Sequence, residues 1–377
     1  MQAGVDACPG MLTLHPARDG DVARIRLPGG YITSRQWSAI AALAREFADG
    51  NVDVTARGNV QVRGLRPAAA GAMADRAAAA GLLPSGAHDR ARNITASPLS
   101  GLGHRPALRR LVQSLDAAIV ADPVLAVLPG RFVFAVDDGT GGAAVARSDV
   151  GLVRTGRQTE LFIAGRSAGI LLPVSAAVPA AITAARAAAA LGVGTNVARI
   201  RDLPGGGTAV AAAIGGIVGA FASPDGGRLA LGVVSLAGRD VAVAGARLGR
   251  LTAGQMQVIG ALLHGTDVLR LAAAGRIVIP LTGAPATAVA RLADSGLLTS
   301  DDDVMSGVSA CSGMACGRSV ADVRALARPL PGHPHTHWAG CARGCGAPAD
   351  ADLIVATGPD GFLIGGQPVA VAITGVS

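Results

Sequence analysis

The sequence predicts an α+β fold in which one unit occurs twice along the chain. Residues 22–82 show strand-like alternation in some segments and helical apolar periodicity in others, in the order strand, helix, strand, strand, helix. Glycine or proline separates these segments. Residues 230–298 repeat the order. A chain of 377 residues is long enough for several domains of this size.

The elements expected in the first copy are two helices and three strands, at 22–30, 34–50, 52–58, 60–65 and 68–83. Those of the second copy are at 229–239, 251–267, 268–275, 277–283 and 286–298. Gly58 of the first copy matches Gly275, and Gly81 matches Gly296. This β-α-β-β-α order predicts mixed sheets of ferredoxin-like type.

The match continues beyond both copies, so the duplicated unit has about 150 residues or more. RNITASPLSGL after the first copy parallels GVSACSGMACG after the second, and GRFVFAVDDG parallels HTHWAGCARG. We therefore expect two half-domains packed about a pseudo-twofold axis with a cleft between them, and two further α+β domains. The predicted segments are 1–85, 86–225, 226–300 and 301–377, the last of which carries the cluster cysteines.

Composition narrows the classes of partner. Half of the residues are apolar but only 2% are aromatic, so the core consists mainly of Ala, Val, Leu and Ile. Every formal positive charge is an arginine, and the net charge of +7 favours anionic partners. The arginines are scattered and few aromatics are present for base stacking, so nucleic acid is not expected.

The sequence predicts no membrane span and a cytoplasmic location. The N-terminal residues show no basic region followed by an apolar run, so no signal peptide is expected. The uncharged stretches 167–185 and 203–224 are rich in Ala and Gly and are interrupted by proline or several glycines. In a reducing compartment, clustered cysteines indicate a metal site rather than disulfides.

Four of the five cysteines lie in two loops rich in small residues. Four residues separate Cys311 from Cys316, and three separate Cys341 from Cys345. Four thiolates on Gly- and Ser-rich loops suit a 4Fe–4S cluster, because backbone approaches closely and donates N–H groups to sulfur. Structural zinc, which prefers knuckles with two intervening residues, and unligated thiols remain alternatives.

The two halves differ where a shared site would need them to differ. The first has no cysteines in its corresponding loops, but it carries polar residues at Arg57, Asn59 and Gln61, where the second has Ala274, Arg276 and Val278. One half thus supplies thiols and the other polar groups. This asymmetry is typical of a single site between diverged halves.

These motifs together resemble the sulfite and nitrite reductase superfamily over nearly the whole chain. The resemblance rests on the two cysteine motifs and on three further segments, which occur in that family's order: VDVTARGNVQVRGL, RNITASP and LPGRFVFAVDDG. The resemblance implies that the four cysteines ligate a 4Fe–4S cluster, whose last cysteine bridges to a sirohaem iron. It also implies a polar lining of the macrocycle or anion site, from which we expect substrate binding by Arg57, Asn59, Gln61, Arg63, Arg92 and Arg131.

Two features depart from the reductase pattern. The first cysteine pair has four intervening residues where the reductases usually have five. Where two lysines usually flank the phenylalanine of the L-P segment, this chain has Arg131 and Val133. Fewer cations around a small oxyanion disfavour sulfite or nitrite reduction.

CPGMLTLHPARDGDVARIRLPGG, residues 8–30, resembles a shorter branch of the superfamily, the precorrin-3B synthases of aerobic cobalamin biosynthesis. That resemblance implies an oxygen-dependent monooxygenase that hydroxylates precorrin-3A and forms a lactone, with NADH as reductant. It also implies a retained cluster and an additional mononuclear non-haem iron. Precorrin-3A carries several carboxylates, which arginine binds bidentately. The pocket for sirohaem would then hold the substrate.

The sequence does not place the mononuclear iron. His335 and His337 share one face of a strand, and Asp137 or Asp138 would complete a site with two histidines and one carboxylate. His15 is a weaker candidate, and His333 belongs to the same HPHTH run. Cys8 is expected to be a buried free thiol. Two other functions remain open: a sirohaem-dependent sulfite or nitrite reductase, and a non-catalytic iron–sulfur or zinc-binding protein.

Overall fold

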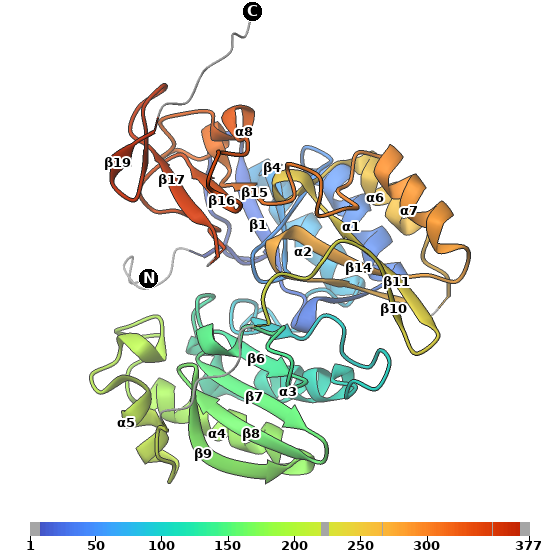
Figure 1. The fold of residues 1–377 in the computed structure, drawn as a ribbon. Helices are drawn as coiled ribbons and strands as arrows, with labels where there is room; N and C mark the ends of the chain where they lie inside the picture. Colours follow the sequence, from blue (N-terminus) through green and yellow to red (C-terminus); the bar gives the residue numbers. More distant parts are fainter. Residues whose placement is uncertain (1–7, 220–225, 266, 349, 370–377) are drawn as a thin grey trace, which may run out of the picture.

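A computed structural model of the chain describes residues 8–219, 226–265, 267–348 and 350–369 (Figure 1). Its mixture of helices and sheets confirms the α+β prediction. Two half-domains pack together, and two further α+β domains lie against them, one built on β5–β9 and one on β15–β19. Among the residues described, no helix combines the length and the apolar character that crossing a bilayer requires.

The first half-domain contains β1, β2, α1, β3, β4 and α2. Their bounds are Asp21–Ile25, Tyr31–Thr33, Ser34–Phe47, Val52–Val54, Val60–Leu65 and Ala70–Ala79. The second contains β10, β11, β12, α6, β13, β14 and α7. Their bounds are Gly232–Leu236, Arg239–Gly245, Arg250–Leu251, Ala253–Gly260, Val268–Leu271, Arg276–Pro280 and Pro285–Asp294.

The domain that follows the first half-domain contains β5, α3, β6, β7, β8, β9, α4 and α5. Their bounds are Ile94–Ala96, Arg109–Ala121, Phe134–Asp137, Val150–Thr155, Gln158–Ile163, Arg166–Pro173, Val174–Ala190 and Gly206–Ala213. The C-terminal domain contains β15, α8, β16, β17, β18 and β19. Their bounds are Val308–Ala310, Val323–Leu326, Thr336–Ala339, Asp352–Ala356, Phe362–Ile364 and Gln367–Pro368.

The structure corrects the expected first strand of the second copy. That strand was expected at 229–239, but the counterpart of β1 is β11, because each of these strands pairs antiparallel with the strand equivalent to β4. β10 is an additional strand, hairpinned onto β11. The alternation of side chains along 229–239 suits a strand. This alternation does not show which strand pairs with β14.

The two halves exchange their short strands. β2 of the first half pairs with β13 of the second, and β12 of the second pairs with β3 of the first. The sheets are therefore ordered β1-β4-β3-β12 and β10-β11-β14-β13-β2. Gly30 permits this exchange: a Cβ atom there would lie 2.0 Å from the Leu271 carbonyl oxygen.

Local signals repeat as the duplication predicts. Thr33 and Gln36 form a capping box at the start of α1, and Thr252 and Gln255 form the same box at the start of α6. Equivalent turns place Gly58 and Gly275 at φ values of 67° and 69°. Both positions need the left-handed backbone that glycine adopts without strain.

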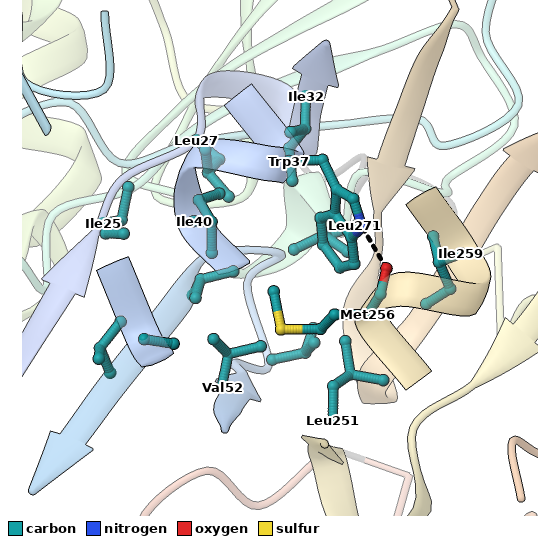
Figure 2. Packing of buried hydrophobic residues seen from close by; sticks show 14 of the residues in the cluster. Ile25, Leu27, Ile32, Trp37, Ile40, Val52, Leu251, Met256, Ile259 and Leu271 are labelled. Carbon is teal, nitrogen blue, oxygen red and sulfur yellow. Dashed lines mark hydrogen bonds between the residues drawn. The ribbon is translucent and has the colours of Figure 1, made fainter. Parts of the chain in front are cut away.

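The half-domains share one hydrophobic core (Figure 2). Trp37 of α1 is 1% exposed, and its indole N–H donates to the carbonyl of Met256 in the other half at 2.9 Å. Leu251 and Leu271 of the second half pack in the same cluster as Ile32. Separating the halves would expose this core, so they form one central unit.

Candidate functional site

One face of the first half-domain's sheet is polar. Side chains alternate along a strand, so Gln61 and Arg63 of β4 share a face while their neighbours enter the core. Arg24 of β1 and Asp53 of β3 both lie opposite Gln61 in the strand register. This face contacts the first cysteine loop.

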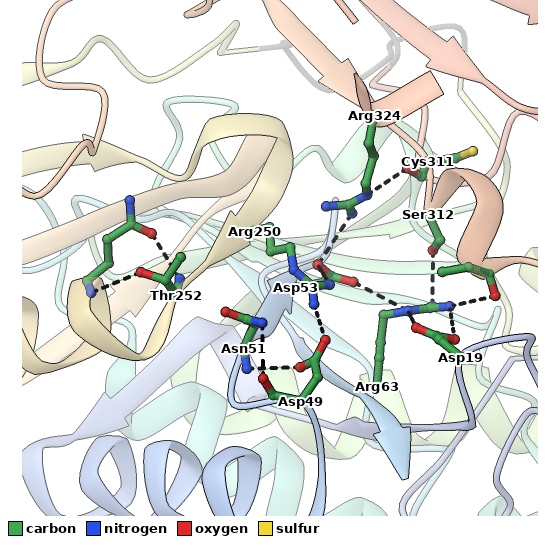
Figure 3. A network of polar contacts seen from close by, with 12 residues as sticks. Asp19, Asp49, Asn51, Asp53, Arg63, Arg250, Thr252, Cys311, Ser312 and Arg324 are labelled. Atoms are coloured by element: carbon green, nitrogen blue, oxygen red, sulfur yellow. Dashed lines mark hydrogen bonds and ion pairs between the residues drawn. The ribbon is translucent and has the colours of Figure 1, made fainter. Parts of the chain in front are cut away.

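Arg63 fastens that loop, residues 311–317, to the sheet (Figure 3). Its guanidinium makes a bidentate pair with Asp19, at 3.1 and 3.0 Å. It also donates to the Ser312 hydroxyl at 3.1 Å and to the Ala315 carbonyl at 3.3 Å. The guanidinium of Arg63 is thus engaged with the protein, and substrate binding by this residue stays a prediction.

Arg324 makes a second connection that the sequence did not reveal. Its Nε donates to the Cys311 carbonyl at 3.0 Å, and another guanidinium nitrogen lies 3.3 Å from Asp53 (Figure 3). Asp53 also pairs with Arg250 of β12 at 3.2 Å. This buried carboxylate therefore joins both half-domains to the loop. Asp53 and Arg324 lie in no motif, so only their contacts identify them.

Two backbone groups point at the Cys311 sulfur. The backbone N–H groups of Gly313 and Gly340 donate to its sulfur at 3.4 and 3.2 Å. Backbone N–H groups that donate to sulfur are typical of the surroundings of iron–sulfur clusters. Gly313 also has a φ of 57°, which turns the loop back toward the sulfur.

His337 supports the second cysteine loop, residues 340–347. It is 1% exposed, and burial lowers its pKa to about 4, so the ring is neutral at pH 7. Nε2 lies 3.2 Å from the Cys345 carbonyl and Nδ1 lies 2.9 Å from the Ser309 hydroxyl. A carbonyl only accepts, so Nε2 carries the proton and Nδ1 faces the Ser309 hydroxyl, which also donates to the Thr336 carbonyl at 3.1 Å.

The four thiols influence one another electrostatically. Partial burial of its thiol raises the pKa of Cys345, and the nearby Cys341, Cys311 and Cys316 act in the same direction, while Arg343 opposes them. Within the described part of the chain, no three His, Cys, Asp or Glu side chains are close enough together to hold a single metal ion. A 4Fe–4S cluster spreads its four thiolates more widely than one ion does.

The corresponding loop of the first half shows what this position requires. There the wholly buried carboxylate of Asp137 accepts from the backbone N–H groups of Gly139, Gly141 and Ala143 at 2.8–2.9 Å, and from Ser97. An internal anion thus organises that loop. The strand register makes Ala339 the equivalent of Asp137, three residues before the position that the sequence match gives, and the second half places cysteines in the loop instead. The residues present therefore fit an anionic cluster as the organising group.

Arginines gather beside the cysteine loops, around His15. Burial lowers the pKa of His15, and four arginines lower it further: Arg343, Arg63, Arg318 and Arg24. Two of them lie near the cysteines in the sequence: Arg318 is two residues after Cys316, and Arg343 lies between Cys341 and Cys345. These guanidinium groups make the surroundings of His15 electropositive.

Arg57, Asn59 and Arg131 meet at the Gly130 loop. Arg57 donates to the Gly130 carbonyl at 3.2 Å, and burial together with Arg199 lowers its pKa to about 10, so it stays charged at pH 7. Asn59 donates to the Asn93 side chain at 3.1 Å, and Asn93 donates to Gly130 at 3.2 Å. Asn59 is 2% exposed, so its contacts are internal.

The remaining predicted substrate-binding residues lie in different surroundings. Arg131 is exposed and has no hydrogen bond or ion pair with the described residues, so its guanidinium faces solvent. Gln61 is half-buried and its side chain likewise makes no hydrogen bond there. Arg92 lies elsewhere, in a bidentate pair with Asp116 of α3 at 2.8 Å.

The residues considered for a second iron are mostly occupied. His337 uses both ring nitrogens, Asp137 uses both oxygens, and His333 pairs with Asp352 at 2.8 Å. His335 has a buried Nδ1 with no hydrogen-bond partner among the described residues. Asp138 accepts from Thr140 at 2.6 Å through one oxygen, and its other oxygen is buried with no hydrogen-bond partner among the described residues. These contacts do not assemble the expected iron site.

Cys8 differs from the expected buried thiol. It is only half-buried. It lies near enough to Arg57 to raise the pKa of that guanidinium, against the lowering by burial. A Cβ atom on Gly130 would come within 3.1 Å of the Cys8 Cβ atom. The segment before β1 therefore packs against the Gly130 loop.

Comparisons with known proteins agree with this architecture. The nitrite/sulfite reductase ferredoxin-like half domain matches residues 15–80. A precorrin-3B synthase from a Sinorhizobium species is 27% identical, over 94% of this chain and 81% of its own length. The ferredoxin–nitrite reductase of Synechococcus elongatus is 34% identical, but the match covers 31% of this chain and only 25% of the reductase.

The solved structure of the Mycobacterium tuberculosis NirA protein has the same fold. Its TM-score is 0.74 at 18% identity, and the match covers 93% of this chain and 75% of that one. Together with the half-domain match, this likeness confirms the predicted duplicated fold.

Proposed function

Because the chain fits the sulfite and nitrite reductase superfamily, we propose that it is an oxidoreductase with the activity of a precorrin-3B synthase. It would hydroxylate precorrin-3A in aerobic cobalamin biosynthesis and close a lactone from an acetate arm. One oxygen atom of O₂ enters the macrocycle and the other leaves as water, and NADH supplies the two electrons. The near full-length relative with this name supports the assignment.

The arginine group beside the cysteine loops is the observation that carries the proposal. Arg24, Arg318 and Arg343 act together on His15, next to the loop that Arg63 fastens. A tetrapyrrole with several acetate and propionate arms presents carboxylates on many sides, and guanidinium groups bind carboxylates in pairs of hydrogen bonds. The geometry therefore favours a polycarboxylated macrocycle.

Cys311, Cys316, Cys341 and Cys345 would hold a 4Fe–4S cluster, which when bound supplies single electrons near the macrocycle. The protein's own groups prepare this place. Gly313 and Gly340 donate to the Cys311 sulfur, and Arg324 holds the Cys311 carbonyl.

The first half would bind and orient the substrate. Arg131 is free to pair with a carboxylate arm, and Arg57 holds the Gly130 loop that carries it. Gln61 is the remaining predicted residue with an uncommitted side chain. Asn59, Arg63 and Arg92 would act indirectly, by keeping backbone and loops in place.

The first test is an absorption and EPR spectrum of protein purified without oxygen, with iron and sulfide assayed on the same sample. We expect a broad iron–sulfur shoulder and no sirohaem bands, followed by conversion of precorrin-3A with O₂ and NADH. Iron in excess of the cluster would support the additional mononuclear iron. Sirohaem bands coupled to the cluster would overturn the proposal.

The second candidate is a sirohaem-dependent sulfite or nitrite reductase, favoured by the match to ferredoxin–nitrite reductase. Sulfite or nitrite reduction with an artificial donor would establish it. A non-catalytic iron–sulfur or zinc-binding protein belongs to a third class, and zinc without sulfide in the metal assay would identify the zinc-binding form.

A further inference from the structure

A cavity of about 460 Å³ lies apart from the cysteine loops. It is bordered by the start of α1, the end of α2 and the first two turns of α3. None of the residues that fasten the first cysteine loop lines it. Its volume lies within the range of roughly 300–1,000 Å³ typical of small-molecule sites.

The cavity combines apolar walls with a cationic rim. Pro28, Tyr31, Ala79, Ala80 and Val268 line it and keep part of their apolar surface accessible. The polar lining includes side-chain amides, such as that of Gln113, as well as guanidinium groups. This composition suits an organic molecule rather than a bare ion.

The charges in the lining do not cancel. Asp116 is the one carboxylate in the lining. It already forms a bidentate ion pair with Arg92, with both distances 2.8 Å. Arg35 and Arg109 also line the cavity, both are exposed, and neither has a hydrogen bond or ion pair with the described residues. Two cations therefore remain for a ligand.

The start of α3 adds to this positive potential. α3 has 13 residues and begins at Arg109, and no side chain caps its first turn. The unpaired N–H groups of a first helical turn attract anions and reinforce a cation at the same place. The cavity, the two uncommitted guanidinium groups and the helix end thus favour the same kind of ligand.

We propose that this cavity binds a small organic anion, whose apolar ring or chain lies on the accessible apolar lining and whose carboxylate or phosphate pairs with Arg35 and Arg109. The proposal does not depend on the reaction assigned to the cysteine loops. It adds a second binding site to the chain.

Calorimetric titration of the purified holoprotein tests this site with three probes at constant ionic strength: adenosine monophosphate, phthalate and inorganic phosphate. The first two combine a ring with phosphate or carboxylate, and their relative affinities identify which anionic group the site takes. We expect inorganic phosphate to bind more weakly than the better organic probe, because it cannot use the apolar wall.

Arg109→Gln should weaken the better organic probe about tenfold or more, since it removes a charge-assisted pair. Arg35→Gln should act in the same direction. Arg110→Gln is the matched control, because Arg110 is the next residue on α3, is exposed and does not line the cavity. Absence of binding by both organic probes at millimolar concentration would overturn the proposal, as would equal losses in Arg109→Gln and Arg110→Gln.

Discussion

The Ser97 hydroxyl and the Cys311 thiol occupy the same position in the two halves of the chain. Each backbone N–H donates to a carbonyl of the adjacent parallel strand, at 3.2 Å for Ser97 and 2.9 Å for Cys311. The Ser97 oxygen accepts from the Asp138 N–H at 3.0 Å, and the Cys311 sulfur accepts from the Gly340 N–H at 3.2 Å. The same backbone position thus holds a hydroxyl oxygen in the first half and a thiol sulfur in the second.

This equivalence predicts that Asp137 is essential to its own loop. Asp137→Ala removes a fully buried carboxylate that accepts from three backbone N–H groups and Ser97. Leaving those donors unpaired should cost about 3–5 kcal/mol of unfolding free energy, measured by urea denaturation. Thr140→Ala, in the same loop, is the control and should cost much less. Equal losses would refute the role of the carboxylate.

The cysteines should divide into two groups. Serine at Cys311, Cys316, Cys341 or Cys345 should abolish most cluster iron and sulfide, because under the proposed function each thiolate would hold one corner of the cluster. Cys8→Ser should retain the cluster, since Cys8 lies beside Arg57 rather than in the loops. Iron, sulfide and EPR measurements on the five variants provide the check. Loss of the cluster in Cys8→Ser would contradict this division.

Arg63 should affect cluster retention rather than substrate affinity. Arg63→Met removes the contacts to Asp19, Ser312 and Ala315, so the first cysteine loop loses its anchor. We expect faster release of iron to a chelator, by about tenfold if the lost contacts contribute about 1.4 kcal/mol. Arg66→Met, at an exposed residue just beyond β4, is the control. A changed KM with unchanged iron release would restore the original substrate-binding prediction.

Arg131 should show the opposite pattern. Arg131→Gln removes an exposed cation that is not paired within the described protein, so stability and iron content should remain unchanged. Affinity for a polycarboxylated tetrapyrrole should fall about tenfold, and the salt dependence of binding should weaken. Fluorescence or absorption titration with the tetrapyrrole measures both quantities. Unchanged affinity would exclude Arg131 from the substrate site.

His15 should titrate below the ordinary histidine pKa. Burial and then the surrounding arginines, Arg343 foremost, disfavour its charged form. The folded protein therefore binds this proton more weakly than the unfolded chain, and stability should fall as pH decreases from about 6.5 toward the lowered pKa. NMR titration of the His15 ring checks the direction. Arg318→Gln should move the pKa upward, and a bound polyanion should do so too.

The duplication was predictable because it rests on local patterns. Capping residues such as Thr33 and Thr252 and turn glycines such as Gly58 and Gly275 act on adjacent backbone, so their signal is visible in the chain itself. The cysteine pairs were visible for the same reason. Register is different: β10 alternates as well as β11 does, and only pairing with β14 shows which one corresponds to β1.

By itself the sequence determined the two copies, the polar and cysteine-bearing halves, and the four thiols in two loops. Only the tertiary structure decided that β2 and β12 change sheets, that Arg63 and Arg324 anchor the first cysteine loop, and that Arg92 pairs with Asp116. The physical reason is that an arginine's role depends on which of its possible acceptors lies within reach. Those acceptors come from residues far away along the chain, such as Ala315 for Arg63, and only folding brings them together.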